Sequence, residues 1–93
     1  GGVIENLPRV MPQGATAVLK RGSWRVPAIF DLIEQLGKID RGEMDRTFNN
    51  GIGMAAIVPA SEADRIVAHL RRRHCGASVI GEVRRGKRGV TFA

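Results

Sequence analysis

The sequence predicts an α/β (α+β) fold, in which a mixed sheet of about four strands is flanked by helices. Three observations support this prediction. With 93 residues the chain can form at most one domain with a modest core. Its composition, 43% hydrophobic and 26% charged, is that of a globular protein. Segments of helical periodicity alternate with short apolar runs of strand length.

The N-terminal segment predicts a short helix, a turn and a strand. Two glycines open a helix over residues 3–7, and Pro8 falls near its end. The Pro-Gln-Gly sequence at residues 12–14 predicts a turn. Residues 16–19 are apolar or β-branched, and we expect them to form a short strand.

The first long helix is predicted over residues 24–37. Pro27 suits a first helical turn, where its missing N–H costs nothing, and Gly37 suits a C-terminal stop. The apolar residues that recur at three- and four-residue spacing, and so share one face, are Ile29, Phe30, Ile33 and Leu36. We therefore expect this amphipathic helix to cover an apolar surface.

The middle of the chain predicts a helical turn and then a buried strand. Residues 40–49 are polar, with a helical turn expected around residues 43–46. Residues 51–58 form a continuous apolar run that Pro59 closes. Such a run is typical of a strand buried on both faces, in the middle of an α/β sheet.

The last part of the chain predicts a helix and a hairpin. Residues 61–73 show a helical apolar stripe, and Ser61 with Asp64 resembles a weakened capping box. Residues 78–83 and 90–92 are expected to be two strands joined by the charged turn between them.

The chain is basic, with a formal net charge of +6. This raises an alternative function, a basic nucleic-acid-binding module, if the clusters at residues 71–74 and 84–88 converge. Against it, the chain has one Trp, three Phe and no Tyr, too few for a stacking platform, and it lacks zinc-ligand spacing. We favour solvated basic turns and expect no nucleic-acid partner.

Other compositional features point to a cytoplasmic protein. No apolar run approaches the roughly 20 residues that cross a bilayer, so we expect no membrane partner. The first residues show no secretory signal and no initiating Met, which suggests a piece of a larger protein. Cys75 is the single cysteine, so no internal disulfide can form, as in a reducing compartment.

A first candidate binding segment lies at the N-terminus. Glycines at a helix start, Gly1 and Gly2, let an anionic ligand approach free backbone N–H groups. Glu5, Asn6 and Arg9 are spaced to converge on such a ligand along a helix. Taken alone, the segment fits better with a glycine-started helix carrying a surface Glu–Arg pair.

A second candidate segment precedes the predicted buried strand. Gly51 and Gly53 suggest a close backbone approach by a ligand or another element. Asn49 and Asn50 would stand at the mouth of the strand, where α/β proteins often bind ligands. The Gly-x-Gly is not a dinucleotide fingerprint, because it lies before a strand and lacks a third glycine. Neither segment identifies a catalytic residue, and we expect no metal ligand.

Together the two segments resemble the phosphoribosylformylglycinamidine cyclo-ligase family, also called aminoimidazole ribonucleotide synthetases. The family shows Gly-Gly-Gly-x-x-Glu-Asn-x-Pro-Arg. Residues 1–9 match this motif from its second glycine onward. It also shows Glu-Met-x-Arg-Thr-Phe-Asn-x-Gly-x-Gly-Met, which residues 43–54 match. Related kinases and synthetases of thiamine and selenium metabolism share the two-domain plan, but the second motif favours the cyclo-ligase.

The resemblance implies a function for the whole enzyme and a place for this chain within it. The enzyme closes the imidazole ring of aminoimidazole ribonucleotide from formylglycinamidine ribonucleotide, using ATP and Mg²⁺ to phosphorylate the formyl oxygen before a nitrogen attacks. It is a homodimer of two-domain subunits, and residues 1–93 would be the latter part of the C-terminal domain. The residues that would contact the phosphorylated substrate are Gly1, Gly2, Glu5, Asn6, Arg9, Asn49, Gly51 and Gly53.

The same resemblance predicts that the chain alone is inactive. The ATP-binding N-terminal domain is absent from it, and the sequence has no P-loop or acidic metal cluster, so we expect no bound cofactor. A truncated sheet also exposes a strand edge and apolar surface. We therefore expect the isolated chain to self-associate or to be marginally stable, and a pure scaffold role stays open.

Overall fold

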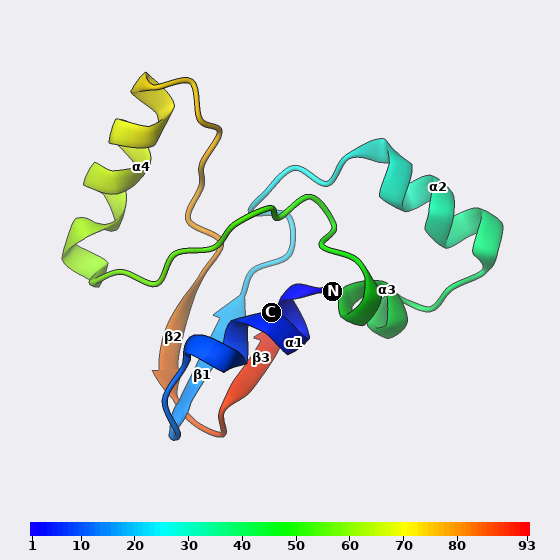
Figure 1. The fold of residues 1–93 in the computed structure, drawn as a ribbon, viewed down its shortest axis with the longest axis horizontal. Helices are drawn as coiled ribbons and strands as arrows, with labels where there is room; N and C mark the ends of the chain where they lie inside the picture. Colours follow the sequence, from blue (N-terminus) through cyan, green and yellow to red (C-terminus); the bar gives the residue numbers. More distant parts are fainter.

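The computed structural model describes all residues, 1–93, and confirms the mixed α/β class (Figure 1). The chain forms four α-helices, two 3-10 turns and three strands. In chain order these are α1 (Val3–Asn6), η1 (Leu7–Val10), β1 (Ala15–Leu19), α2 (Ala28–Gly37), α3 (Arg41–Thr47), η2 (Ala60–Glu62), α4 (Ala63–Arg72), β2 (Gly81–Arg85) and β3 (Gly89–Phe92). None of the helices is long and apolar enough to span a membrane.

The sheet has three strands in the order β2-β1-β3, one fewer than expected. β1 runs antiparallel to β2 and parallel to β3, so that Val18 lies opposite Glu82 on one side and Thr91 on the other. The predicted hairpin of β2 with β3 is wrong, because β1 lies between them. The link between β2 and β3 crosses the start of β1, where the Gly86 N–H donates to the Gly14 carbonyl at 2.9 Å. The central strand thereby has hydrogen-bonding partners on both edges.

The apolar run at residues 51–58 is not a strand, which corrects the expectation of a buried one. Its side chains are largely exposed, with Met54 at 91% and Ile57 at 48%. A strand that is buried on both faces needs neighbours in a sheet and layers above and below it. β2 and β3 pair only with β1, and the run adds to neither of their free edges, so it has no neighbouring strand.

α2 begins later than predicted and is less covered than its pattern suggests. It starts at Ala28 with Pro27 as its N-cap, and Lys38, at φ 51°, forms the left-handed cap after Gly37. Part of its apolar stripe faces solvent, since Ile29 is 54% exposed and Leu36 is 77% exposed. Figure 1 shows α2 and α4 projecting from opposite sides of the sheet rather than lying on it.

α4 is shorter than the predicted helix and lacks the predicted cap. Ser61 falls inside η2, which runs directly into α4, and no side chain caps either helix. Because the 3-10 turn already holds the backbone in a helical conformation, Ser61 does not occupy the extended N-cap position that a capping box requires.

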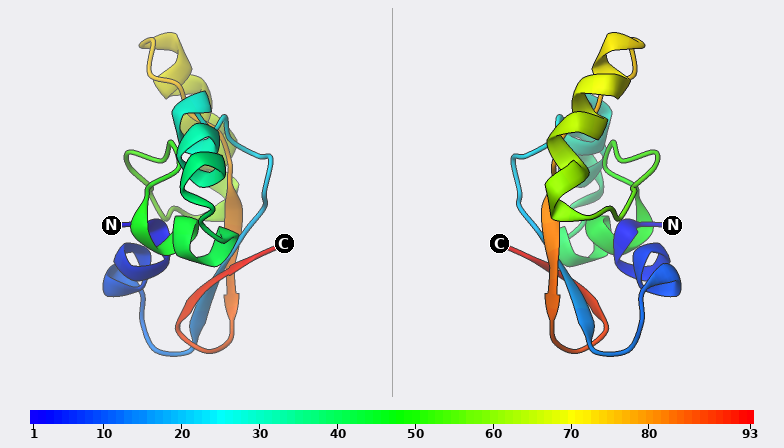
Figure 2. Two further views of the ribbon diagram at one scale, coloured as in Figure 1. Left: turned by 90° about the vertical axis from the view of Figure 1, so that its right-hand side faces the viewer. Right: turned by 90° about the vertical axis from the view of Figure 1, so that its left-hand side faces the viewer.

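The core lies between the N-terminal helical turns and one face of the sheet, as the side views in Figure 2 show. Its buried members are Leu7, Met11, Ala17 and Leu19. Only seven of the 93 residues are buried. The Cα radius of gyration is 14.0 Å, against about 12 Å for a compact domain of this length. The chain therefore closes only a small core around β1.

Candidate functional site

The two candidate segments, far apart in the sequence, pack against each other in the structure. The Gly2 N–H donates to the Arg46 carbonyl oxygen at 2.9 Å, which fixes the start of α1 against the end of α3. A Cβ on Gly2 would lie 1.9 Å from the Asp45 carbonyl oxygen and 2.9 Å from that of Phe48. Gly2 is thus needed for contact between two backbones, which gives it a packing role inside the site.

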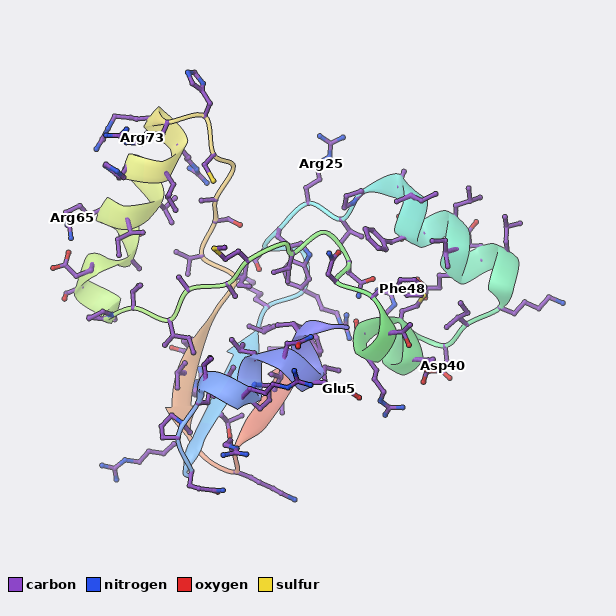
Figure 3. All side chains as sticks on the ribbon, viewed as in Figure 1. Glu5, Arg25, Asp40, Phe48, Arg65 and Arg73 are labelled. Carbon is purple, nitrogen blue, oxygen red and sulfur yellow. The ribbon has the colours of Figure 1, made fainter.

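α3 carries a charged surface up to this junction. The Asp40 side chain caps α3 by accepting from the Glu43 N–H at 3.0 Å. Arg46, one turn further on, donates to Glu43 at 3.2 Å and lies 3.9 Å from Glu5 on α1. Figure 3 shows Glu5 on α1 beside the α3 region that holds Asp40 and Phe48. Arg46 therefore bridges the two segments, a role that no local spacing could have indicated.

The N-terminal segment does not form the predicted surface pair. Glu5 has its ion-pair contact with Arg46, and Arg9 makes no ion pair or side-chain hydrogen bond. η1 replaces α-helix from Leu7 onward, so the four-residue α-helical spacing between Glu5 and Arg9 is lost. Asn6 folds back, donating to the Gly2 carbonyl at 2.9 Å.

The residues of this segment face different parts of the fold. Gly1 and Asn6 are exposed beside α3, and a Cβ on Gly1 would lie 2.7 Å from the Asn6 amide nitrogen. Arg9 lies on η1, which packs against β3 instead of α3. The structure therefore brings the first part of the segment to α3. It holds Arg9 near β3, where its side chain is exposed and its charge has no acidic partner.

The second segment forms a tight turn after α3. The Asn49 side-chain oxygen accepts from the Gly51 N–H at 2.8 Å. Asn50 and Gly51 both adopt positive φ, at 50° and 98°. A Cβ on Gly51 would lie 2.6 Å from Pro27, so this glycine also has a packing role.

Gly53 differs from the other glycines of the site. No atom lies within 4 Å of the place where its Cβ would be, and its φ is not in the left-handed region. Nothing in this chain therefore requires glycine at this position.

Behind the turn lies an ion pair between a buried carboxylate and a partly exposed arginine, which no local pattern along the chain predicts. Asp45 is 4% exposed and accepts from Arg21, which lies after β1, at 2.6 Å. Asp45 also accepts from the Asn50 side-chain amide at 3.3 Å. A small pocket of about 50 Å³ opens beside these groups, between α2 and α3. No pattern along the chain relates Arg21 to Asp45, since only the fold makes them neighbours.

The two basic clusters do not converge. Arg71–His74 lies at the far end of α4, and residues 86–88 form the turn between β2 and β3 at the opposite end of the molecule (Figure 3). The convergence on which the nucleic-acid-binding alternative depends is therefore absent from this fold.

Comparison with known proteins assigns the chain to a family. Residues 1–93 match the family model for AIR synthase related protein, C-terminal domain, so the chain belongs to that family. Among its relatives is the phosphoribosylformylglycinamidine cyclo-ligase of Symbiobacterium thermophilum, 48% identical over 83 residues, or 89% of this chain and 24% of the relative. The cyclo-ligase of Caldicellulosiruptor bescii is 46% identical over 92 residues, or 99% of this chain and 27% of the relative. The chain spans about a quarter of the length of these curated relatives.

Proposed function

We propose that this chain is the C-terminal part of an ATP-dependent cyclo-ligase that converts formylglycinamidine ribonucleotide to aminoimidazole ribonucleotide in purine synthesis. The observation that carries the proposal is the packing of the two motif segments on each other through Gly2 and Arg46. The relatives' name, phosphoribosylformylglycinamidine cyclo-ligase, supports the same reaction.

In this reaction ATP would transfer its terminal phosphoryl group to the formyl oxygen of the substrate. The amidine nitrogen would then attack the formyl carbon, and phosphate would leave as the ring closes, with ADP as the other product. Transfer of this kind depends on positioned nucleotide and metal ligands. In this chain no three His, Cys, Asp or Glu side chains come together to hold a metal ion. ATP and Mg²⁺ would accordingly be bound by the remainder of the longer enzyme.

The residues of this chain would contribute binding rather than chemistry. Arg9 is the best candidate for the substrate phosphate, because it is exposed and has no acidic partner. Arg46 is less suitable, since Glu5 and Glu43 offset its charge. Asn6 and Asn49 carry exposed amides, and Gly53 leaves room for close approach. We expect each of these residues to contact the substrate, Arg9 from η1, Asn6 from α1, and Asn49 and Gly53 from the segment after α3.

The exposed apolar surface would be covered by the rest of the enzyme. An open groove of about 560 Å³ runs between the first helical turns, the sheet and the extended segment after α3. Its lining residues are Val10, Met11, Pro12, Ala15, Ala55, Ile57 and Val83. Apolar surface of this kind marks a place of association. We propose that the remaining part of the C-terminal domain packs here within a homodimeric enzyme, and that the chain alone is inactive.

An ATP-dependent cyclisation assay tests the proposal. The full-length protein and the isolated chain are incubated separately with formylglycinamidine ribonucleotide and ATP, and aminoimidazole ribonucleotide is measured. Product from the full-length protein and none from the chain is the expected result. A well-folded full-length protein that forms no product would exclude the cyclo-ligase and direct attention to the related ATP-dependent kinases and synthetases.

A further inference from the structure

Asp45 is the one charged side chain that this chain buries, and its contacts join three segments. One oxygen accepts from Arg21 at 2.6 Å. The other accepts from Arg21 at 3.4 Å and from the Asn50 amide at 3.3 Å. A buried carboxylate that lost these partners would be strongly unfavourable, so the contacts hold one another in place.

Asn50 is held from two sides. Its side-chain amide donates to Asp45 and, at 3.4 Å, to the Met44 carbonyl oxygen, both on α3. Its own carbonyl oxygen accepts from the Trp24 indole N–H at 3.1 Å. A non-glycine residue at positive φ is conformationally costly, and these three hydrogen bonds stabilise it. The backbone of the turn is thus clamped between α3 and the segment before α2.

The same network reaches the sheet. The Arg21 guanidinium that binds Asp45 also stacks over the Phe92 ring, with its Cζ atom 4.1 Å from the ring centroid. The backbone N–H of Arg21 donates to the Ala93 carbonyl oxygen at 3.3 Å. Phe92 is the last residue of β3. A continuous set of contacts therefore runs from the rigid sheet through Arg21 and Asp45 to Asn50.

Asn50 lies between two of the residues that we expect to contact substrate, Asn49 and Gly51. Its side chain points back to α3, whereas Asn49 is exposed and bonds only within the turn.

We propose that Asp45 is a positioning residue that, through Asn50, sets the orientation of the Asn49–Gly51 turn for substrate binding. The proposal rests on the cyclo-ligase function proposed above. Asp45 itself is too deeply buried to touch the substrate. It would act by fixing the turn before the substrate arrives, so that binding does not have to order it.

The test exchanges the carboxylate and the amide in the full-length enzyme. Asn50→Asp places two carboxylates about 3.3 Å apart and should raise the KM for formylglycinamidine ribonucleotide about tenfold, with kcat little changed. Asp45→Asn with Asn50→Asp restores an amide–carboxylate contact but gives up the Arg21–Asp45 ion pair, so it should recover only part of that loss. Arg65→Gln, which breaks the exposed Arg65–Glu62 pair on α4, is the control and should behave like the wild type.

Two outcomes would overturn the proposal. A KM in Asn50→Asp equal to that of the wild type would show that the turn needs no positioning. A double variant no better than Asn50→Asp would show that the pair is not coupled. Thermal melting of each variant separates positioning from general destabilisation, since a loss of stability alone would lower kcat together with the folded fraction.

A second measurement keeps this proposal distinct from the cyclo-ligase function. If the wild-type enzyme forms no product, the proposed function fails, and the network is judged by hydrogen exchange of peptides covering residues 49–53. Exchange should be faster in Asn50→Asp than in the wild type, and slower again in the double variant. Equal exchange in all three proteins would reject the positioning role.

Discussion

The Gly2 N–H and the Arg46 carbonyl oxygen meet at 2.9 Å, at a point where the first turn of α1 touches the last turn of α3. The approach is possible because residue 2 has no side chain. Any Cβ there would lie 1.9 Å from the carbonyl oxygen of Asp45. The two motif segments can therefore form one surface only with glycine at this position.

Gly2→Ala should consequently separate α1 from α3. We expect the full-length protein to lose about 2 kcal/mol of stability, because the backbones must move apart and lose their hydrogen bond. Calorimetry or urea denaturation measures the change. Gly76→Ala is the matched control, since no atom lies within 4 Å of its Cβ position. Equal stability of the two variants would contradict the packing role of Gly2.

Asn6→Ala and Arg9→Ala test substrate contact at the N-terminal segment. If Arg9 binds the substrate phosphate, Arg9→Ala removes a charge-assisted hydrogen bond and should raise the KM of the full-length enzyme about tenfold. Asn6→Ala should have a smaller effect, because part of its amide already bonds to the Gly2 carbonyl. Steady-state kinetics with varied formylglycinamidine ribonucleotide gives both values. Unchanged KM and kcat in both variants would remove this segment from the binding site.

Gly51→Ala and Gly53→Ala should separate the two uses of glycine in the second segment. Gly51→Ala is expected to destabilise the protein by about 1 to 3 kcal/mol, because its φ of 98° and the nearby Pro27 both oppose a Cβ. Gly53→Ala should leave the melting temperature unchanged, because no atom lies within 4 Å of its Cβ position, and should raise the KM if the substrate approaches Gly53 as proposed. The reverse pattern would show that the assigned roles are exchanged.

The isolated chain should self-associate. Its exposed apolar side chains include Met54, Ile57 and Val83, and the outer edges of β2 and β3 have no strand partner. Sedimentation velocity over a range of concentrations should show species larger than a monomer. Replacing Ile57 and Val83 with Lys should reduce association by charging the open groove. A monomeric chain with a cooperative, high-temperature melt would be inconsistent with this prediction.

The basic surface should bind nucleic acid only weakly. The clusters at the ends of α4 and β2 lie at opposite ends of the molecule (Figure 1), so they do not form one continuous basic patch. We expect fluorescence anisotropy with a labelled duplex to detect binding at low salt that disappears near physiological ionic strength. Tight or sequence-selective binding at physiological salt would revive the alternative function.

The sequence by itself determined the fold class, the helices near residues 28–37 and 63–72, and the family. Helical periodicity and turn residues act over a few positions, so they can be read locally. The two motifs likewise identify the family without any knowledge of their contacts. The short N-terminal helix and the strand at residues 15–19 followed from the same local signals.

Only the tertiary structure decided which segments meet. The apolar run at residues 51–58 has the composition of a buried strand, yet it stays outside the sheet and pairs with no strand, because strand formation depends on tertiary context as well as on composition. β1 lies between β2 and β3, so these two strands do not pair as the hairpin that was expected. The pairs Gly2–Arg46 and Arg21–Asp45 join residues with no local relationship. Such contacts depend on the path of the whole backbone, which sequence spacing does not record.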